Sequence, residues 1–229
     1  MPEDSMNDTP AHTIRAQAFP LGHYSTNCYL VYDEDSKEGW VVDCSWGPRP
    51  MIEQARELGL NITKIVLTHA HVDHIAGLDE VRQAFPDATV YLHEDEAHWL
   101  GDAAANLSAG HGQPFTTEPA DVLLKHGQTL ELGETVWTVH HTPGHSPGSV
   151  TLHCPALSAA IVGDVLFHRS IGRADFPTSD YDRLKKSITE VLYRFADDTV
   201  CLPGHGEATT IGDERRYNPF VPDPSVAAR

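Results

Sequence analysis

The stretch Thr68-His69-Ala70-His71-Val72-Asp73-His74 follows a short apolar run at 64–67 and precedes apolar residues at helical spacing, Ile75, Leu78, Val81 and Phe85. This pattern predicts a strand, a histidine-rich loop and then a helix. His69, His71, Asp73 and His74 place four side chains of metal-ligand type within six residues. Imidazole nitrogen and carboxylate oxygen suit Zn²⁺ and similar cations. The stretch therefore predicts a metal site at the end of a strand.

Three later segments also end a β-like run in a polar residue flanked by glycine: Gly144-His145, Gly163-Asp164 and Gly204-His205-Gly206. Glycine lets the backbone turn sharply where a strand ends and present the next side chain to a shared edge. We therefore expect His145, Asp164 and His205 to join the histidine-rich loop.

The alternation of apolar runs and turn residues predicts two groups of strands with helices outside them. Strands are predicted at 14–19, 28–32, 40–42, 64–67, 89–92, 122–124, 129–132, 136–139, 150–153, 159–162 and 199–202. Helices are predicted at 51–58, ending at Gly59, and at 75–85, 94–100 and 184–195, the last with a Ser179/Asp182 capping box. The order of elements favours an α/β (α+β) sandwich whose strand-end loops share one edge.

Length and composition predict one domain over residues 12–220, with flexible tails at 1–11 and 221–229. The chain has 229 residues, 15 of them histidine, and a formal net charge of −17. Such a charge disfavours nucleic acid and anionic membranes as partners. No leader or membrane segment is evident, and the four cysteines form no CxxC pair, so we expect a cytoplasmic protein. The glycine-containing stretch 101–119 has the length of a lid over a site.

The series HxHxDH, His145, Asp164 and His205 resembles the metallo-β-lactamase-fold hydrolases and, among them, the glyoxalase II group. Gly172-Arg173-Ala174-Asp175-Phe176-Pro177 and residues 209–220 are similar to the short bacterial hydroxyacylglutathione hydrolase-like subgroup. The resemblance runs from Phe19 to Phe220 and implies a four-layer αββα sandwich with a metal site at one edge of the two sheets. The C-terminal helical domain that contacts glutathione in glyoxalase II is not expected here, since 24 residues follow His205.

The resemblance also implies a role for each ligand. One divalent metal ion would bind His69, His71 and His145, a second would bind Asp73, His74 and His205, and Asp164 would bridge them. Zinc is the expected metal, with iron or manganese as alternatives. A hydroxide bridging the ions would be the nucleophile, with Asp73 and Asp164 as the catalytic carboxylates.

Two residues outside the ligand set receive roles with an alternative each. Asp43 would orient the metal site without binding metal, or it is a turn residue after a strand. Arg173 would face the carboxylates of a glutathione-like substrate, or it forms a salt bridge within its loop. Candidate pocket walls are Tyr24, Trp46, His111 and Phe176, whereas His93, His140 and His153 are expected to be packed, neutral imidazoles.

The predicted function is that of a metal-dependent thioesterase of glyoxalase II type, cleaving S-lactoylglutathione or a related small acyl-thiol. The alternatives are a mononuclear iron persulfide dioxygenase and a lactone or ester hydrolase on the same fold. Asp164 is similar to the bridging carboxylate of thioesterases and lactonases, which disfavours a β-lactamase. The complete ligand set also argues against a module that only binds a partner.

Overall fold

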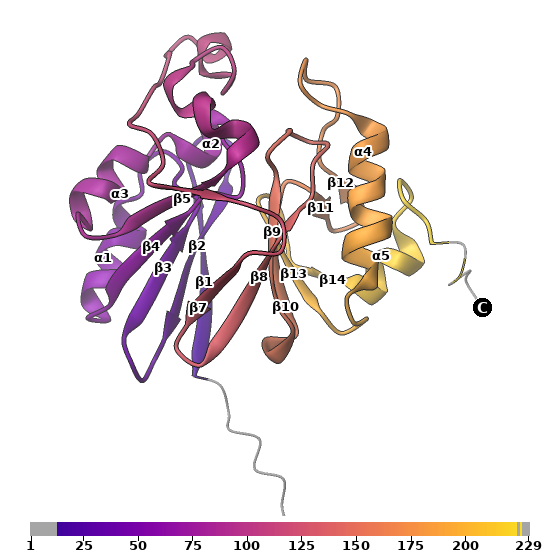
Figure 1. Cartoon of the computed structure of the whole chain (residues 1–229), viewed down its shortest axis with the longest axis horizontal. Helices are drawn as coiled ribbons and strands as arrows, with labels where there is room; N and C mark the ends of the chain where they lie inside the picture. Colours follow the sequence, from indigo (N-terminus) through magenta and orange to yellow (C-terminus); the bar gives the residue numbers. More distant parts are fainter. Residues whose placement is uncertain (1–12, 224, 226–229) are drawn as a thin grey trace, which may run out of the picture.

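The computed structural model describes residues 13–223 and 225, and these form two facing sheets with helices on both outer faces (Figure 1). Helices α1 and α3 cover one sheet, and α4 and α5 cover the other. The predicted four-layer αββα sandwich is therefore confirmed.

The first sheet holds six strands in sequence order, β1-β2-β3-β4-β5-β6. Their bounds are β1 (Ile14–Leu21), β2 (Thr26–Asp33), β3 (Glu38–Val42), β4 (Asn61–Val66), β5 (Thr89–His93) and β6 (Val122–Leu124). The first three strands pair antiparallel, and β3 to β6 pair parallel. Since neighbouring parallel strands end at the same edge, the loop after β4 emerges there.

The second sheet also has six strands, in the order β14-β13-β10-β9-β8-β7. Their bounds are β7 (Thr129–Leu132), β8 (Thr135–His141), β9 (Val150–Cys154), β10 (Ala159–Gly163), β13 (Val200–Pro203) and β14 (Thr209–Thr210). Strands β10 and β13 pair parallel, so Asp164 and His205 follow strands that end side by side. A separate hairpin pairs β11 (Leu166–Phe167) with β12 (Ser170–Ile171).

Helices lie between and beyond these strands. The α-helices are α1 (Arg49–Glu57), α2 (Val72–Ile75), α3 (Leu78–Ala84), α4 (Tyr181–Lys186) and α5 (Ile211–Tyr217). The 3-10 helices are η1 (Glu94–Gly101), η2 (Ser108–His111), η3 (Pro155–Leu157) and η5 (Leu192–Arg194), and η4 (Ser187–Val191) is a π-helix.

Three apolar clusters separate the four layers. In β2, Cys28 and Leu30 pack toward α1 and α3, whereas Tyr29 and Val31 pack toward the second sheet. A strand that is buried on both faces reads as a continuous apolar run, which is why β2 shows little alternation. Trp40 and Trp137 fill the space between the sheets with ring centroids 6.0 Å apart. The third cluster packs α4 and α5 against β10 and β13.

Several local expectations differ from the structure. The helix predicted at 75–85 is two helices, since α2 ends before Gly77 and α3 begins after it. A Cβ on Gly77 would lie 2.2 Å from the Ser45 carbonyl oxygen, so the close approach of that backbone requires glycine. The helix predicted at 184–195 divides into α4, η4 and η5. The predicted capping box is wrong, because the Asp180 side chain caps α4 by accepting from the Arg183 N–H.

The described residues also bear on the chain ends and the surface. Val221 is buried and Asp223 pairs with Arg215, so packing extends beyond residue 220; the predicted tail at 1–11 lies outside the described residues.

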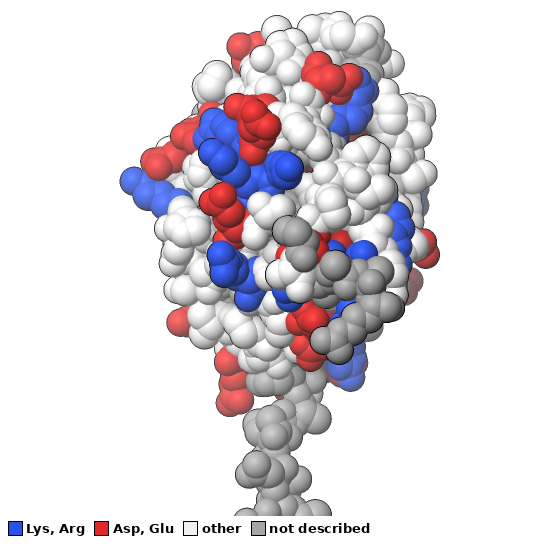
Figure 2. Space-filling model, turned by 90° about the vertical axis from the view of Figure 1, so that its right-hand side faces the viewer, with Lys and Arg blue, Asp and Glu red and all other residues white. Residues whose placement is uncertain are grey.

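The face that carries α4 and α5 mixes basic and acidic side chains despite the net charge of −17 (Figure 2). Among the residues that the structure describes, no helix is long and apolar enough to cross a membrane.

Candidate metal centre

The loop after β4 carries four of the predicted ligands. His69 and His71 lie in the extended segment, and the backbone turns into α2 at His71, so Asp73 and His74 fall in the first turn of that helix. The Val72 N–H donates to the Asn106 carbonyl, and the His74 carbonyl accepts from the Cys44 N–H. These bonds fix the loop against two neighbouring segments.

The other three predicted ligands come from the second sheet. His145 follows Gly144, where φ is +138° and a Cβ would meet the Leu184 nitrogen of α4 at 2.1 Å. Asp164 directly follows β10, and His205 follows β13. The sites predicted from separate segments of sequence are therefore brought to one edge of the two sheets.

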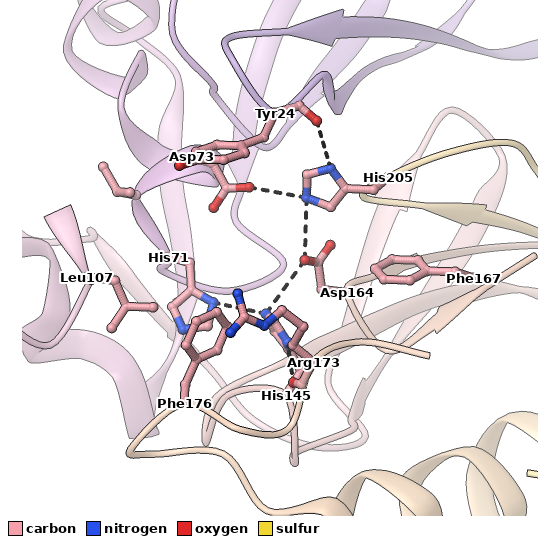
Figure 3. A pocket seen from close by; sticks show the side chains of 11 residues that line it. Tyr24, His71, Asp73, Leu107, His145, Asp164, Phe167, Arg173, Phe176 and His205 are labelled. Carbon is pink, nitrogen blue, oxygen red and sulfur yellow. Dashed lines mark hydrogen bonds and ion pairs between the residues drawn. The ribbon is translucent and has the colours of Figure 1, made fainter. Parts of the chain in front are cut away.

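The seven side chains lie within contact distance of one another, and Figure 3 shows five of them around the pocket. His71 Nδ1 lies 2.9 Å from His145 Nε2, and His205 Nε2 lies 3.1 Å from Asp73 Oδ2. Asp164 is in the middle: its carboxylate lies 3.4 Å from His74, 3.6 Å from His145 and 3.5 Å from His205. This central position is the one that a bridging carboxylate requires.

The donor atoms fall into groups that fit metal ions. His69, His71 and His145 form one group, Asp73, His74 and His205 form another, and His69, His74 and Asp164 form a third between them. Buried polar atoms ordinarily have hydrogen-bond partners. Among the described residues, His69 Nε2, His71 Nε2, His74 Nε2 and Asp164 Oδ1 are buried without one. Buried imidazole nitrogens and a carboxylate oxygen of this kind match the needs of divalent cations.

Burial and neighbouring charge divide the histidines into two classes. Burial lowers the pKa of His71 to about 3 and holds the pKa of His69 and His145 below its ordinary value, so these imidazoles are neutral and able to donate lone pairs. Burial alone would also lower the pKa of His205, but the carboxylates of Asp164 and Asp73 raise it to about 9. The part of the site around Asp73 and Asp164 thus attracts positive charge.

Asp43 contacts the ligands from behind. Its carboxylate accepts hydrogen bonds from the Thr68 N–H at 2.7 Å, the Thr68 hydroxyl at 2.8 Å and His74 Nδ1 at 2.8 Å. The bond to Nδ1 leaves His74 Nε2 facing the centre. Asp43 holds a left-handed backbone conformation, φ +61°, which costs energy in a residue other than glycine. These bonds join Asp43 to a candidate ligand, and its orienting role stays a prediction.

A cavity of about 290 Å³ opens over the ligands, with largely apolar walls (Figure 3). Tyr24, Leu107, Phe167 and Phe176 line it, together with Val72 and Arg173. Leu107 belongs to the 101–119 stretch and brings it to one side of the cavity, and a lid role for that stretch stays a prediction. Trp46, also predicted as a wall, does not line this cavity, although its ring lies 6.2 Å from the Tyr24 ring between centroids; the His111 side chain is outside the described residues.

Arg173 lines the cavity and is also ion-paired within its loop. Its guanidinium binds both carboxylate oxygens of Asp175 at 2.9 Å and lies 4.4 Å above the Phe176 ring. The salt bridge within the loop, which was the alternative role for Arg173, is therefore present. Arg173 nevertheless borders the cavity.

Sequence reasoning missed residues that hold the ligand loops. The Thr26 hydroxyl donates to Asp73, and the Asn27 side chain donates to the carbonyls of Pro203 and Gly206 around His205. The buried carboxylate of Glu96 accepts from the Ala70 N–H in the loop of His69 and His71 and from the Gly148 N–H in the loop after His145. Such residues carry no spacing signal, because their partners are distant in sequence and most are backbone groups.

Comparison with known proteins agrees with this geometry. Residues 21–205 match the model of the metallo-beta-lactamase superfamily. The chain is 38% identical to the probable metallo-hydrolase YqgX of Bacillus subtilis, covering 91% of this chain and 98% of that protein. It is 32% identical to the hydroxyacylglutathione hydrolase GloC of Haemophilus influenzae, with the same coverage of 91% and 98%.

Solved structures show the same relationship. The BLEG-1 B3 metallo-beta-lactamase superposes with a TM-score of 0.86 at 41% identity, covering 90% of this chain and 99% of that one. ETHE1 from Myxococcus xanthus gives 0.74 at 28% identity, with 90% and 84% coverage. TTHA1623 in a di-iron-bound form gives 0.78 at 33% identity, with 89% and 99% coverage. The chain belongs to the metallo-beta-lactamase superfamily, and it is a metallo-hydrolase of that family.

Proposed function

We propose that this protein is a two-metal thioesterase of glyoxalase II type, which cleaves S-lactoylglutathione or a related small acyl-thiol. The observation that carries the proposal is the convergence of seven donor side chains, several with unpartnered buried atoms, of which five line a largely apolar cavity. The similarity to GloC, whose name states hydroxyacylglutathione hydrolysis, supports the same substrate class.

The metal ions would be held as the sequence analysis assigns them. His69, His71 and His145 would hold one ion, Asp73, His74 and His205 would hold the other, and Asp164 would be shared. When bound, two divalent cations supply a hydroxide at neutral pH and polarise the substrate carbonyl. Zinc is the proposed metal, and the di-iron form of TTHA1623 supports iron as an alternative.

The residues of the chain itself position the substrate. Phe176, Leu107 and Val72 give the acyl group an apolar wall that excludes bulk water. Arg173 borders the cavity mouth with an exposed guanidinium, where it would face a carboxylate on the thiol part of the substrate. A thiol has a pKa near about 8.5, so the thiolate leaves without a general acid. We accordingly assign no separate proton donor.

A second candidate is β-lactam hydrolysis, because the BLEG-1 structure at 41% identity is named a B3 metallo-beta-lactamase. Opening a strained amide needs the same nucleophile as cleaving a thioester. It differs in the leaving group, since an amine nitrogen must be protonated as it departs. The position of Asp164 among three histidines argues for the thioesterase, as the sequence analysis did.

The experiment measures metal content and specific activity on one preparation. The purified chain is assayed for thiol release from S-lactoylglutathione and acyl-CoA, for lactone and cephalosporin hydrolysis, and for oxygen uptake with glutathione persulfide. We expect two metal ions per chain and the highest kcat/KM on an acyl-thiol, abolished in His71→Ala. One iron per chain with oxygen uptake would instead establish the dioxygenase, and preferred cephalosporin turnover would establish the lactamase.

A further inference from the structure

Glu96 is a fully buried carboxylate outside the predicted ligand set. It lies in η1, directly after β5, and its hydrogen-bond partners are neutral: the Ala70 N–H, the Gly148 N–H and the Ser146 side chain. Burying a carboxylate is costly unless its oxygens are well bonded. Burial raises the pKa of Glu96 to about 7, although all three hydrogen bonds act in the opposite direction. A buried carboxylate maintained at this cost indicates a specific role.

The partners of Glu96 belong to two ligand loops. Ala70 lies between His69 and His71, and its N–H is 2.6 Å from Glu96 Oε2. Gly148 lies three residues after His145, and its N–H is 2.6 Å from Glu96 Oε1. One side chain therefore joins the loop of the first sheet to a loop of the second sheet. These two loops supply the complete His69, His71 and His145 group.

The contact is tight on the side of the second loop. A Cβ on Gly148 would lie 2.8 Å from Glu96 Cγ and 3.0 Å from its Cδ, so glycine is needed for the backbone to approach. A second residue of η1 also lies beside the candidate ligands, since the Trp99 ring centroid is 5.5 Å from that of His71. The Glu96 side chain spans the gap between the two loops.

We propose that Glu96 is a positioning residue that sets the separation of the two loops and thereby the metal affinity of the His69, His71 and His145 group. The inference rests on the metal centre of the proposed function and is independent of the substrate. Ligands held at the right separation before the metal arrives need no reordering when it binds, and partners that orient ligands affect metal affinity by about 10–100-fold.

Glu96→Gln is the discriminating substitution. The amide keeps the volume of the side chain, but it has one acceptor oxygen and directs an NH₂ group at the second backbone N–H. One of the two loops therefore loses its bond and meets a repulsive donor. Glu214→Gln is the matched control, because Glu214 is also fully buried and accepts from the Thr209 hydroxyl, the Arg169 N–H and the Asn218 side chain, remote from both loops.

The test is a Zn²⁺ titration of metal-free protein against a chelator of known affinity, done in two backgrounds. His205→Ala leaves the His69, His71 and His145 group intact, and His71→Ala disrupts it. We expect Glu96→Gln to weaken Zn²⁺ binding about 10–100-fold in the His205→Ala background and less than about threefold in the His71→Ala background. Glu214→Gln should lower the unfolding midpoint while leaving both Zn²⁺ affinities unchanged.

An equal loss of affinity in both backgrounds, or in neither, would overturn the positioning role. A wild-type chain that binds Zn²⁺ as expected but hydrolyses no acyl-thiol would contradict the proposed substrate and leave the role of Glu96 supported. A wild-type chain that binds no metal would overturn both the proposed function and the positioning role of Glu96.

Discussion

At the scale of single residues, Asp43 bonds directly to one of the candidate ligands, His74, without being a ligand itself. It ties His74 to Thr68 from a left-handed backbone position. Asparagine tolerates that backbone conformation, so Asp43→Asn removes the charge and one acceptor with little added strain. We expect a loss of metal affinity of about 10–100-fold, measured by competition with a chelator. Asp33→Asn, a buried aspartate that bonds Thr13 and Ser36, should leave the affinity unchanged.

His153 predicts an acid sensitivity that involves no metal ligand. Its ring stacks on Phe195 at 3.7 Å, and burial followed by the effect of His140 lowers its pKa to about 4. The unfolded chain then binds more protons than the folded chain between pH 6.5 and about 4. The contribution of His153 to stability is present above pH 6.5 and is lost as the pH falls through that window.

His153→Phe keeps an aromatic ring against Phe195 and removes the titration. The free energy of unfolding, measured by urea denaturation of metal-free protein at pH 7 and pH 4, should fall less in the variant, by about 1 kcal/mol. The figure is smaller than the full pKa difference implies, because the side chain is partly exposed. Parallel losses in the variant and wild type would assign the acid sensitivity to other groups.

Residue types and spacing predicted the seven side chains that the structure brings together, because a metal centre needs donors of fixed chemistry at the ends of strands. The expectation that His93 and His153 are packed imidazoles agrees with the structure, where burial lowers the pKa of each to about 4. Glu96 was not found. In Glu94-Asp95-Glu96 it reads as one of three ordinary acidic residues, and its burial depends on partners 26 and 52 residues away.

At the scale of elements, the loop after β13 places backbone against the ligands. A Cβ on Gly204 would lie 2.2 Å from Asp164 Oδ1 and 2.7 Å from His74 Cε1, whereas Gly206 has open space around it at φ +77°. Gly204→Ala must therefore displace the shared carboxylate. We expect it to abolish activity and lower the metal content, measured by elemental analysis. Gly206→Ala should retain metal and lose about 1 kcal/mol of stability to backbone strain.

The long strands and α1 were predicted from their apolar patterns, and the errors lie in short or distorted elements. The two-residue strands β11, β12 and β14 are too short for alternation to be visible. The change from α4 to the π-helix η4 coincides with a tertiary contact, in which the Ser187 hydroxyl donates to the Pro143 carbonyl. Periodicity within one segment carries no information about such a partner.

At the scale of the whole molecule, metal binding should be coupled to folding. The donors are contributed by both sheets, so an unfolded chain does not present them together. A ligand at a thousand times its dissociation constant stabilises by about 4 kcal/mol, which is about 10 °C in the melting temperature of a domain this size. Chelation should lower the melting temperature by that order and added Zn²⁺ should restore it, measured by calorimetry. A temperature that responds to neither would contradict the metal centre.

The division of the donors between two sheets has one more consequence. His69, His71, Asp73 and His74 move with the first sheet, and His145, Asp164 and His205 move with the second. If one sheet slides over the other, the distances between donors change even when each loop keeps its shape. The rate at which the protein loses metal should therefore depend on how the two sheets are aligned. Trp137 packs on Trp40 between the two sheets. A substitution of Trp137 should therefore speed metal release, although it changes none of the candidate ligands.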